Sequence, residues 1–167
     1  MKTQKQRRIQ RKTDYKARLG LLKSGLSRIA IRKTNKYIIV QLIKSNEARD
    51  TIEIGISSKE LLKHGWPEKS KGSLKSIPAA YLTGYLTGKE IVKKYPKSKV
   101  VLDLGLQRAV SGGKIYAALN GLVDSGIKIS HNEKIFPKKE RIQGKHLKNN
   151  VNGIVEKIKE KIDKDGR

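Results

Sequence analysis

Cysteine is absent from the sequence, which excludes disulfides and thiolate metal sites. Histidine is scarce, and the only three, His64, His131 and His146, are scattered without the spacing of metal ligands. Long apolar runs are also missing, since no segment approaches the roughly 20 residues of a membrane-spanning helix. The start of the chain likewise lacks the apolar middle of a signal peptide. We therefore expect no metal, no cofactor and no membrane partner, and a cytoplasmic protein.

Acidic residues are few, with 15 of them against 39 lysines and arginines, so the 167-residue chain carries a formal net charge of +24. Self-repulsion on this scale disfavours a compact fold unless a polyanion neutralises it. Hydrophobic residues make up 36%, which suffices for one domain with basic segments outside its core. The composition predicts nucleic acid as the partner, with an anionic membrane surface as the main competitor.

The positive charge is concentrated at the N-terminus. Residues 1–36 contain 13 lysines and arginines against a single acid, Asp14, which gives a net charge of +12. A surface that serves only solubility mixes positive and negative charges, whereas this segment carries almost only positive ones. Residues 1–12 also have almost nothing to bury, so we predict a basic arm that becomes ordered on RNA. Six residues carry its charge: Lys2, Lys5, Arg7, Arg8, Arg11 and Lys12.

Residues 13–131 are predicted to form an α/β domain. A helix is expected over 14–24, capped by Thr13 or Asp14 and ended by Gly25. Three segments with alternating apolar residues follow, and together they predict an antiparallel meander: 28–32, 37–43 and 51–57. In the first, Arg28 and Arg32 are expected on an exposed basic face. In the third, the isoleucines at 52, 54 and 56 are expected to share the core face.

The second half of the domain alternates helix and strand. A long helix is expected from Ser76 to about Lys94, with Gly84 and Gly88 placed to allow a close approach to the sheet. The apolar run 99–104 predicts a strand between helices, made parallel to a neighbour by the crossover, and another helix follows Lys114. Residues 132–167 are expected to form a basic loop and a C-terminal amphipathic helix.

The strand, glycine pair and helix around residue 112 resemble a nucleotide-binding motif only superficially. A Walker loop with its lysine at Lys114 needs glycine at position 108, which is Arg108, and Ser or Thr at position 115, which is Ile115. The backbone amides of Gly112 and Gly113, with Arg108 and Lys114, instead suit an RNA phosphate, unless this is an ordinary connecting loop. No catalytic constellation is visible, so an enzyme is not expected. A phosphate-handling enzyme stays as an alternative that nucleotide binding to this loop would reveal.

The predicted RNA contacts fall into two groups. The first group positions phosphates and consists of Arg7, Arg8, Arg11, Lys12, Arg18, Arg28, Arg32, Lys33 and Lys36. The second group adds sugar or base contacts and consists of Thr34, Asn35, Tyr37 and Gln41. Tyr15, like Tyr37, offers a plane on which an unpaired base can stack, although such a ring more often serves only packing.

Several runs in this sequence occur together in one known family. They are Lys12-Thr13-Asp14-Tyr15, Arg28 to Arg32, Lys33-Thr34-Asn35-Lys36, Gly65-Trp66, Pro78 to Gly84, Leu102 to Leu106, Asp124-Ser125-Gly126 and Phe136-Pro137. These runs span nearly the whole chain, and they resemble the archaeal form of ribosomal large-subunit protein eighteen. One departure is Ala109, where the family usually has proline.

The resemblance implies a three-layer α/β fold with a mixed sheet, flanked by helices. It also implies binding to 5S rRNA through the N-terminal extension, contacts with the large-subunit rRNA, and a place in the central protuberance. Neighbouring large-subunit proteins, including the other 5S rRNA binder, would then be partners. The alternative is a non-ribosomal RNA-binding or ribosome-assembly factor, which would exchange reversibly from ribosomes.

Overall fold

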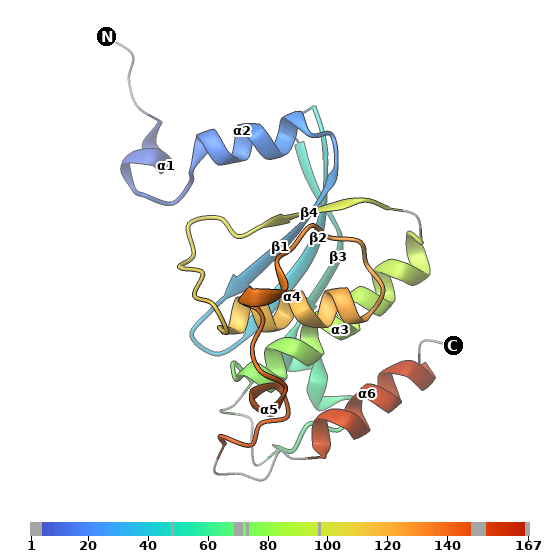
Figure 1. Ribbon diagram of the computed structural model, residues 1–167. Helices are drawn as coiled ribbons and strands as arrows, with labels where there is room; N and C mark the ends of the chain where they lie inside the picture. The colour runs from blue at the N-terminus through green and yellow to red at the C-terminus, as the bar shows by residue number, and fades with distance from the viewer. Residues whose placement is uncertain are drawn as a thin grey trace.

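A four-stranded mixed sheet forms the centre of the computed structural model, which describes residues 5–47, 49–68, 72, 74–96, 98–147 and 153–165 (Figure 1). Its strands are β1 (Ser27–Lys33), β2 (Ile38–Asn46), β3 (Arg49–Ser57) and β4 (Val100–Asp103). Their order is β3-β2-β1-β4, with β1, β2 and β3 antiparallel and β4 parallel to β1. The predicted meander with an added parallel strand is therefore confirmed.

Two of the main helices begin where the sequence supplies a capping side chain. The main ones are α2 (Tyr15–Lys23), α3 (Ile77–Lys94), α4 (Lys114–Asp124) and α6 (Ile154–Asp165); short turns are α1 (Gln6–Ile9), η1 (Ser58–Leu62), η3 (Glu133–Ile135) and α5 (Lys139–Ile142). Asp14 accepts hydrogen bonds from two amides of the first turn of α2, and Ser76 accepts one from Ala79 in α3. Within the described ranges, no helix is both long and apolar enough to span a membrane.

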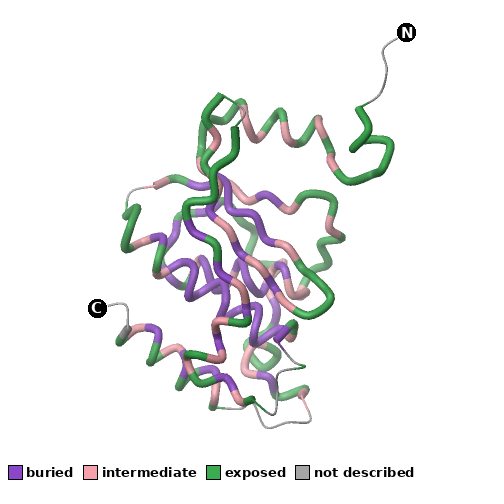
Figure 2. Tube along the Cα trace, turned by 180° about the vertical axis from the view of Figure 1, so that it is seen from behind, coloured by how far each residue is buried: buried purple, intermediate pink, exposed green. Residues whose placement is uncertain are grey.

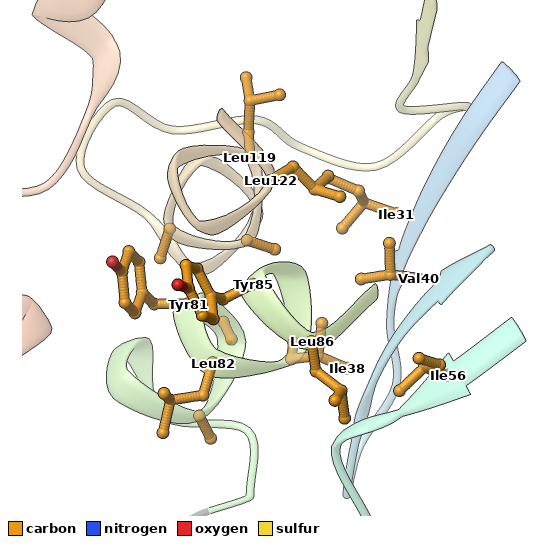
Figure 3. Close-up of a cluster of buried hydrophobic side chains, with 14 of the residues drawn as sticks. Ile31, Ile38, Val40, Ile56, Tyr81, Leu82, Tyr85, Leu86, Leu119 and Leu122 are labelled. Carbon is orange, nitrogen blue, oxygen red and sulfur yellow. The ribbon is translucent and has the colours of Figure 1, made fainter. Parts of the chain in front are cut away.

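The core lies between the sheet and the helices α3 and α4, which cover one of its faces (Figure 3). Alternation along β1 and β2 sends Ile31, Ile38 and Val40 to this face, where they meet Leu86 of α3 and the leucines of α4. The three residues from the strands have no exposed surface. Because side chains alternate along a strand, polar side chains lie on the opposite face of the sheet.

Glycines let α3 and α4 pack with their backbones in contact. A Cβ on Gly84 would lie 2.0 Å from the carbonyl oxygen of Ala118, and one on Gly121 would lie 2.1 Å from that of Tyr81. A Cβ on Gly88 would likewise collide with the hydroxyl of Ser125. The prediction of a close approach at Gly84 and Gly88 is thus correct, but the partner is α4 and not the sheet.

Replacing Gly84 by alanine is expected to lower the free energy of unfolding by about 3 kcal/mol, because the added methyl group overpacks a backbone contact. Urea denaturation measures this loss. Gly20→Ala is the matched control, since a Cβ at Gly20 meets no atom within 4 Å and alanine favours the helix. Equal stability of the two variants would show that the α3–α4 contact can separate without cost.

A bulge in β3 overturns one sequence-based prediction. Leu42 pairs with Ile54, but Ile43 pairs with Ile52, so the register shifts and Glu53 is the extra residue. The shift turns Ile52 away from the core face, so this residue is 59% exposed. Ile54 and Ile56 stay buried. Alternation alone cannot show such an inserted residue.

The C-terminal helix packs on its own domain. Val155, Ile158 and Ile162 of α6 join the main core, and α6 contacts α3. The hydroxyl of Tyr85 donates a 2.7 Å hydrogen bond to Oδ1 of Asp163, which also binds Lys89 at 2.7 Å. Residues 154–165 are thus part of the folded body. Residues 148–152, which belong to the C-terminal segment expected over 132–167, lie outside the described residues.

Candidate RNA interface

The N-terminal segment lies beyond the sheet, apart from α3 and α4 (Figure 1). All described residues from 5 to 12 are exposed, and Figure 2 shows this exposed stretch leading into α2. One helical turn, α1, interrupts the expected arm, but it buries no residue. Arg7 donates to the hydroxyl of Thr13 at 3.0 Å, and the ammonium of Lys5 lies 4.6 Å from the ring centre of half-buried Tyr15. Lys2 lies outside the described residues.

A chain of alternating charges joins α2 to the sheet. Arg18 of α2 binds Asp50 of β3 at 2.6 Å, and Asp50 in turn binds Arg28 of β1 at 2.7 Å. Arg28 also binds Asp103 of β4 at 3.2 Å, and Arg32 binds the same carboxylate at 3.1 Å and its main-chain oxygen at 2.7 Å. Three arginines and two aspartates thus link three strands and a helix on the face opposite the core.

The predicted exposure of Arg28 is wrong. Its exposed fraction is 2%, because the carboxylates of Asp50 and Asp103 and the hydroxyl of Ser45 surround the guanidinium. A phosphate cannot reach the two terminal nitrogens without displacing those acceptors. Arg32 differs, since its side chain keeps 33% of its surface exposed. The sequence pattern missed Asp50 and Asp103, which lie far from Arg28 along the chain.

We expect this network to make the docking of α2 dependent on pH. Burial tends to raise the pKa of Asp50, but hydrogen bonds from Ser45, Arg18 and Arg28 outweigh burial and hold this pKa below its usual value of 3.8. A depressed carboxyl pKa contributes stability that is complete above the unfolded value and is lost as pH falls through the folded value.

Asp50→Asn should therefore be less stable than the wild type near neutral pH, and the difference should shrink as pH falls below about 4. Thermal unfolding of both proteins from about pH 6 to about pH 2.5 measures the difference. If the difference in stability between the two proteins stays constant over this range, the charge of Asp50 does not hold the network. Asp14→Asn, which keeps a capping oxygen on α2, controls for general acid effects.

A pocket of about 580 Å³ opens between the N-terminal segment and the sheet. Arg7 and Lys12 line it from the arm, Arg28 and Arg32 from β1, and Leu106 from the loop after β4. Ala17, Arg18, Gly20 and Leu21 of α2 also line the pocket. The structure thus brings arm, helix and strand residues from the predicted set to one place.

We call the exposed and half-exposed cations of this region the N-terminal basic surface: Arg7, Arg8, Arg11, Lys12, Arg18 and Arg32.

The turn between β1 and β2 carries a second group of predicted residues. The hydroxyl of Thr34 donates to the carbonyl oxygen of Tyr37 and accepts from its amide, both at 2.9 Å, so this hydroxyl closes the turn. Lys33, Asn35 and Lys36 are exposed, and the side chain of Tyr37 is half-buried against the core. Gln41 is half-buried farther along β2, paired with Ala30 and Gly55.

The loop before α4 is not the cradle of free amides that one of the two interpretations of its sequence predicted. The amide of Gly112 donates to Ile135 and that of Gly113 to Val110, each at 2.9 Å, so neither is free for a phosphate. The arrangement also does not match a nucleotide-binding loop, whose amides must point at the ligand. What the loop offers instead is side-chain charge from Arg108 and Lys114, beside a start of α4 that no side chain caps.

Lys114 lies among other cations. Burial and the nearby positive charges of Lys75 and Lys33 lower the pKa of Lys114. Lys33, Arg108 and Lys114 line a common pocket of about 200 Å³. We call Lys33, Lys75, Arg108 and Lys114 the loop basic surface. Sequence analysis missed Lys75, whose only signal is its position just before the Ser76 cap of α3.

The described residues contain no cluster of three or more histidine, aspartate or glutamate side chains arranged to hold a metal ion.

Comparison with known proteins decides the family. A family model described as "Ribosomal large subunit proteins 60S L5, and 50S L18" matches residues 1–100 and 95–132. The chain belongs to this family of large-subunit ribosomal proteins. The resemblance given by the sequence motifs is therefore confirmed, and the basic surfaces described above lie within the matched residues, from Arg7 to Lys114.

Archaeal members of the family match most of the chain. The large ribosomal subunit protein uL18 of Korarchaeum cryptofilum is 44% identical over 141 residues, which cover 84% of this chain and 70% of the relative. That of Methanococcus maripaludis is 43% identical over 150 residues, covering 90% and 75%. That of Methanococcoides burtonii is 39% identical over 162 residues, covering 93% and 90%.

Proposed function

We propose that this protein is a structural constituent of the large ribosomal subunit that binds 5S rRNA and helps attach it to the large rRNA in the central protuberance. The observation that carries the proposal is the N-terminal basic surface. Its arm holds four exposed arginines and lysines between residues 7 and 12, while the aspartates nearby are engaged within the protein. Such unneutralised charge favours an RNA backbone.

The two basic surfaces support contacts with more than one RNA segment. The N-terminal basic surface surrounds a pocket between arm and sheet, whereas the loop basic surface lies at the start of α4. We assign the first to 5S rRNA and the second, together with Lys36 and Asn35 of the hairpin turn, to the large-subunit rRNA. Arg28 has a different task from that of its neighbours, because it holds the α2 side of the interface on the sheet.

The proposed role requires no chemistry of the protein itself. Positioning of rRNA rests on phosphate contacts, with sequence read in exposed loops and bulges, because the deep major groove of an RNA helix is closed to side chains. We therefore propose a non-enzymatic, ribosome-bound protein whose partners are the two rRNAs and neighbouring large-subunit proteins, including the other 5S rRNA binder.

Binding to 5S rRNA is expected to weaken steeply with salt. The logarithm of the affinity should fall against the logarithm of the salt concentration with a slope of roughly −4 to −9, which corresponds to about 6 to 10 neutralised phosphates. Filter binding at several salt concentrations measures the slope, and an unstructured RNA of equal length is the control. A slope near zero, or equal affinity for the control RNA, would contradict the proposal.

A further inference from the structure

The pocket between α2, β1 and the loop after β4 is larger and more apolar than a phosphate contact needs. Its volume of about 580 Å³ lies within the range of roughly 300–1,000 Å³ that small-molecule sites occupy. We propose that this pocket takes the base of one unpaired RNA nucleotide, extruded from its stack. This inference rests on the proposed binding of 5S rRNA and names one contact within it.

Arg28, one of the residues that line the pocket, has a hydrogen-bond donor without a partner. Nη1 of Arg28 binds Asp103, and Nη2 binds Asp50 and Ser45. Nε is the one buried side-chain nitrogen or oxygen in the described part of the chain that has no partner. Arg28 lines the pocket and cannot turn its Nε elsewhere without breaking these bonds. A buried donor without an acceptor costs free energy, so binding would be favoured for a ligand whose acceptor atom reaches Nε.

The walls suit the flat faces of a base. Leu21 comes from α2, and Leu104 and Leu106 come from the loop after β4, with Leu106 53% exposed. Unpaired bases are recognised in this way, with their faces on apolar or planar side chains and their edges on hydrogen-bond donors. A phosphate alone gains nothing from such walls, because it has no apolar surface to bury.

The rim supplies charge for the phosphates on either side of the base. Arg7 and Lys12 line the pocket from the arm and are exposed. The two acids of the lining are already engaged: Asp14 caps α2, and Asp103 holds Arg28, Arg32 and the amide of Gly105. Each carboxylate in the described lining therefore has a cationic or amide partner, which weakens its repulsion of the RNA backbone.

Gly20 allows the pocket to be filled without removing a cation. It lines the pocket, and a Cβ there meets no atom within 4 Å, so Gly20→Leu places a branched side chain in the cavity and improves the helix. Gly20→Ala improves the helix and leaves the cavity open, which makes it the matched control. We expect Gly20→Leu to bind 5S rRNA about tenfold more weakly than Gly20→Ala, the loss expected for one stacked base.

The base itself is tested by abasic 5S rRNAs, in which one unpaired nucleotide at a time keeps its sugar and phosphate but lacks its base. One position should weaken the wild type and Gly20→Ala about tenfold and should leave Gly20→Leu unchanged. If Gly20→Leu weakens binding but no abasic position couples with it, the pocket takes a phosphate only and the proposal is wrong. Equal affinity of Gly20→Leu and Gly20→Ala also overturns it while leaving 5S rRNA binding intact. Failure of the wild type to bind 5S rRNA would overturn both proposals.

Discussion

Replacing Arg28 by alanine is expected to lower the free energy of unfolding by about 3–5 kcal/mol, because removing one member of a buried ion pair leaves its partners without compensation. Asp103 is 8% exposed and would lose one of its two arginines, and Asp50 would lose the bond that ties it to β1. Urea denaturation followed by circular dichroism measures the loss.

Arg32→Ala is the matched control for this prediction. Arg32 binds the same carboxylate, but its side chain is 33% exposed, so its loss should cost only about 1 kcal/mol. Arg28→Lys, which keeps the charge but cannot bind both aspartates in the same geometry, should be intermediate. A stability of Arg28→Ala within about 0.5 kcal/mol of the wild type would show that the network does not fasten the sheet face.

Removing the charge of the arm is expected to have the largest effect on RNA binding. Arg7, Arg8 and Arg11 are exposed, and changing all three to glutamine should lower affinity for 5S rRNA about a hundredfold at moderate salt. The salt slope should become shallower by about 0.7 to 0.9 for each phosphate that the arm no longer neutralises, or by roughly 2 to 3 in total. Filter binding at several salt concentrations gives both quantities.

Lys157→Gln, Lys161→Gln and Lys164→Gln together provide the control, since they remove three exposed cations from α6 on the body of the protein. This variant should keep most of its affinity and its salt slope. Neither triple variant should change the melting temperature of the free protein by many degrees, because none of the six side chains is buried. An arm variant that melts much lower yet binds RNA normally would make the arm a structural element instead.

Local features of the fold followed from the sequence because their causes are local. Asp14, one of the two expected caps, begins α2, and Ser76, the expected helix start, begins α3. Alternation placed β1 and β2 within a few residues of their observed limits. The inserted residue at Glu53 could not be foreseen, since a bulge depends on the register with β2. Gly84 was correctly assigned to a close contact, but its partner is set by how α3 crosses α4.

The candidate site was only partly predictable, because its decisive contacts join distant positions. Arg28 and Asp103 are 75 residues apart in the sequence, and no pattern along β1 indicates that their side chains meet. The exposure of the charged residues in the arm could be predicted directly, because a segment with so few apolar residues cannot form a core of its own. One of the two interpretations of the loop before α4 required free amides at Gly112 and Gly113, but these amides donate to the carbonyl oxygens of Ile135 and Val110.

Hydroxyl-radical footprinting of 5S rRNA tests the proposed function most directly. The intact protein should protect a limited set of riboses, and the variant with Arg7, Arg8 and Arg11 changed to glutamine should lose part of that set while keeping the rest. The α6 triple variant should reproduce the full pattern. A 5S rRNA that shows no more protection than an unrelated RNA of equal length, at low salt and saturating protein, would contradict the assignment of this protein to 5S rRNA.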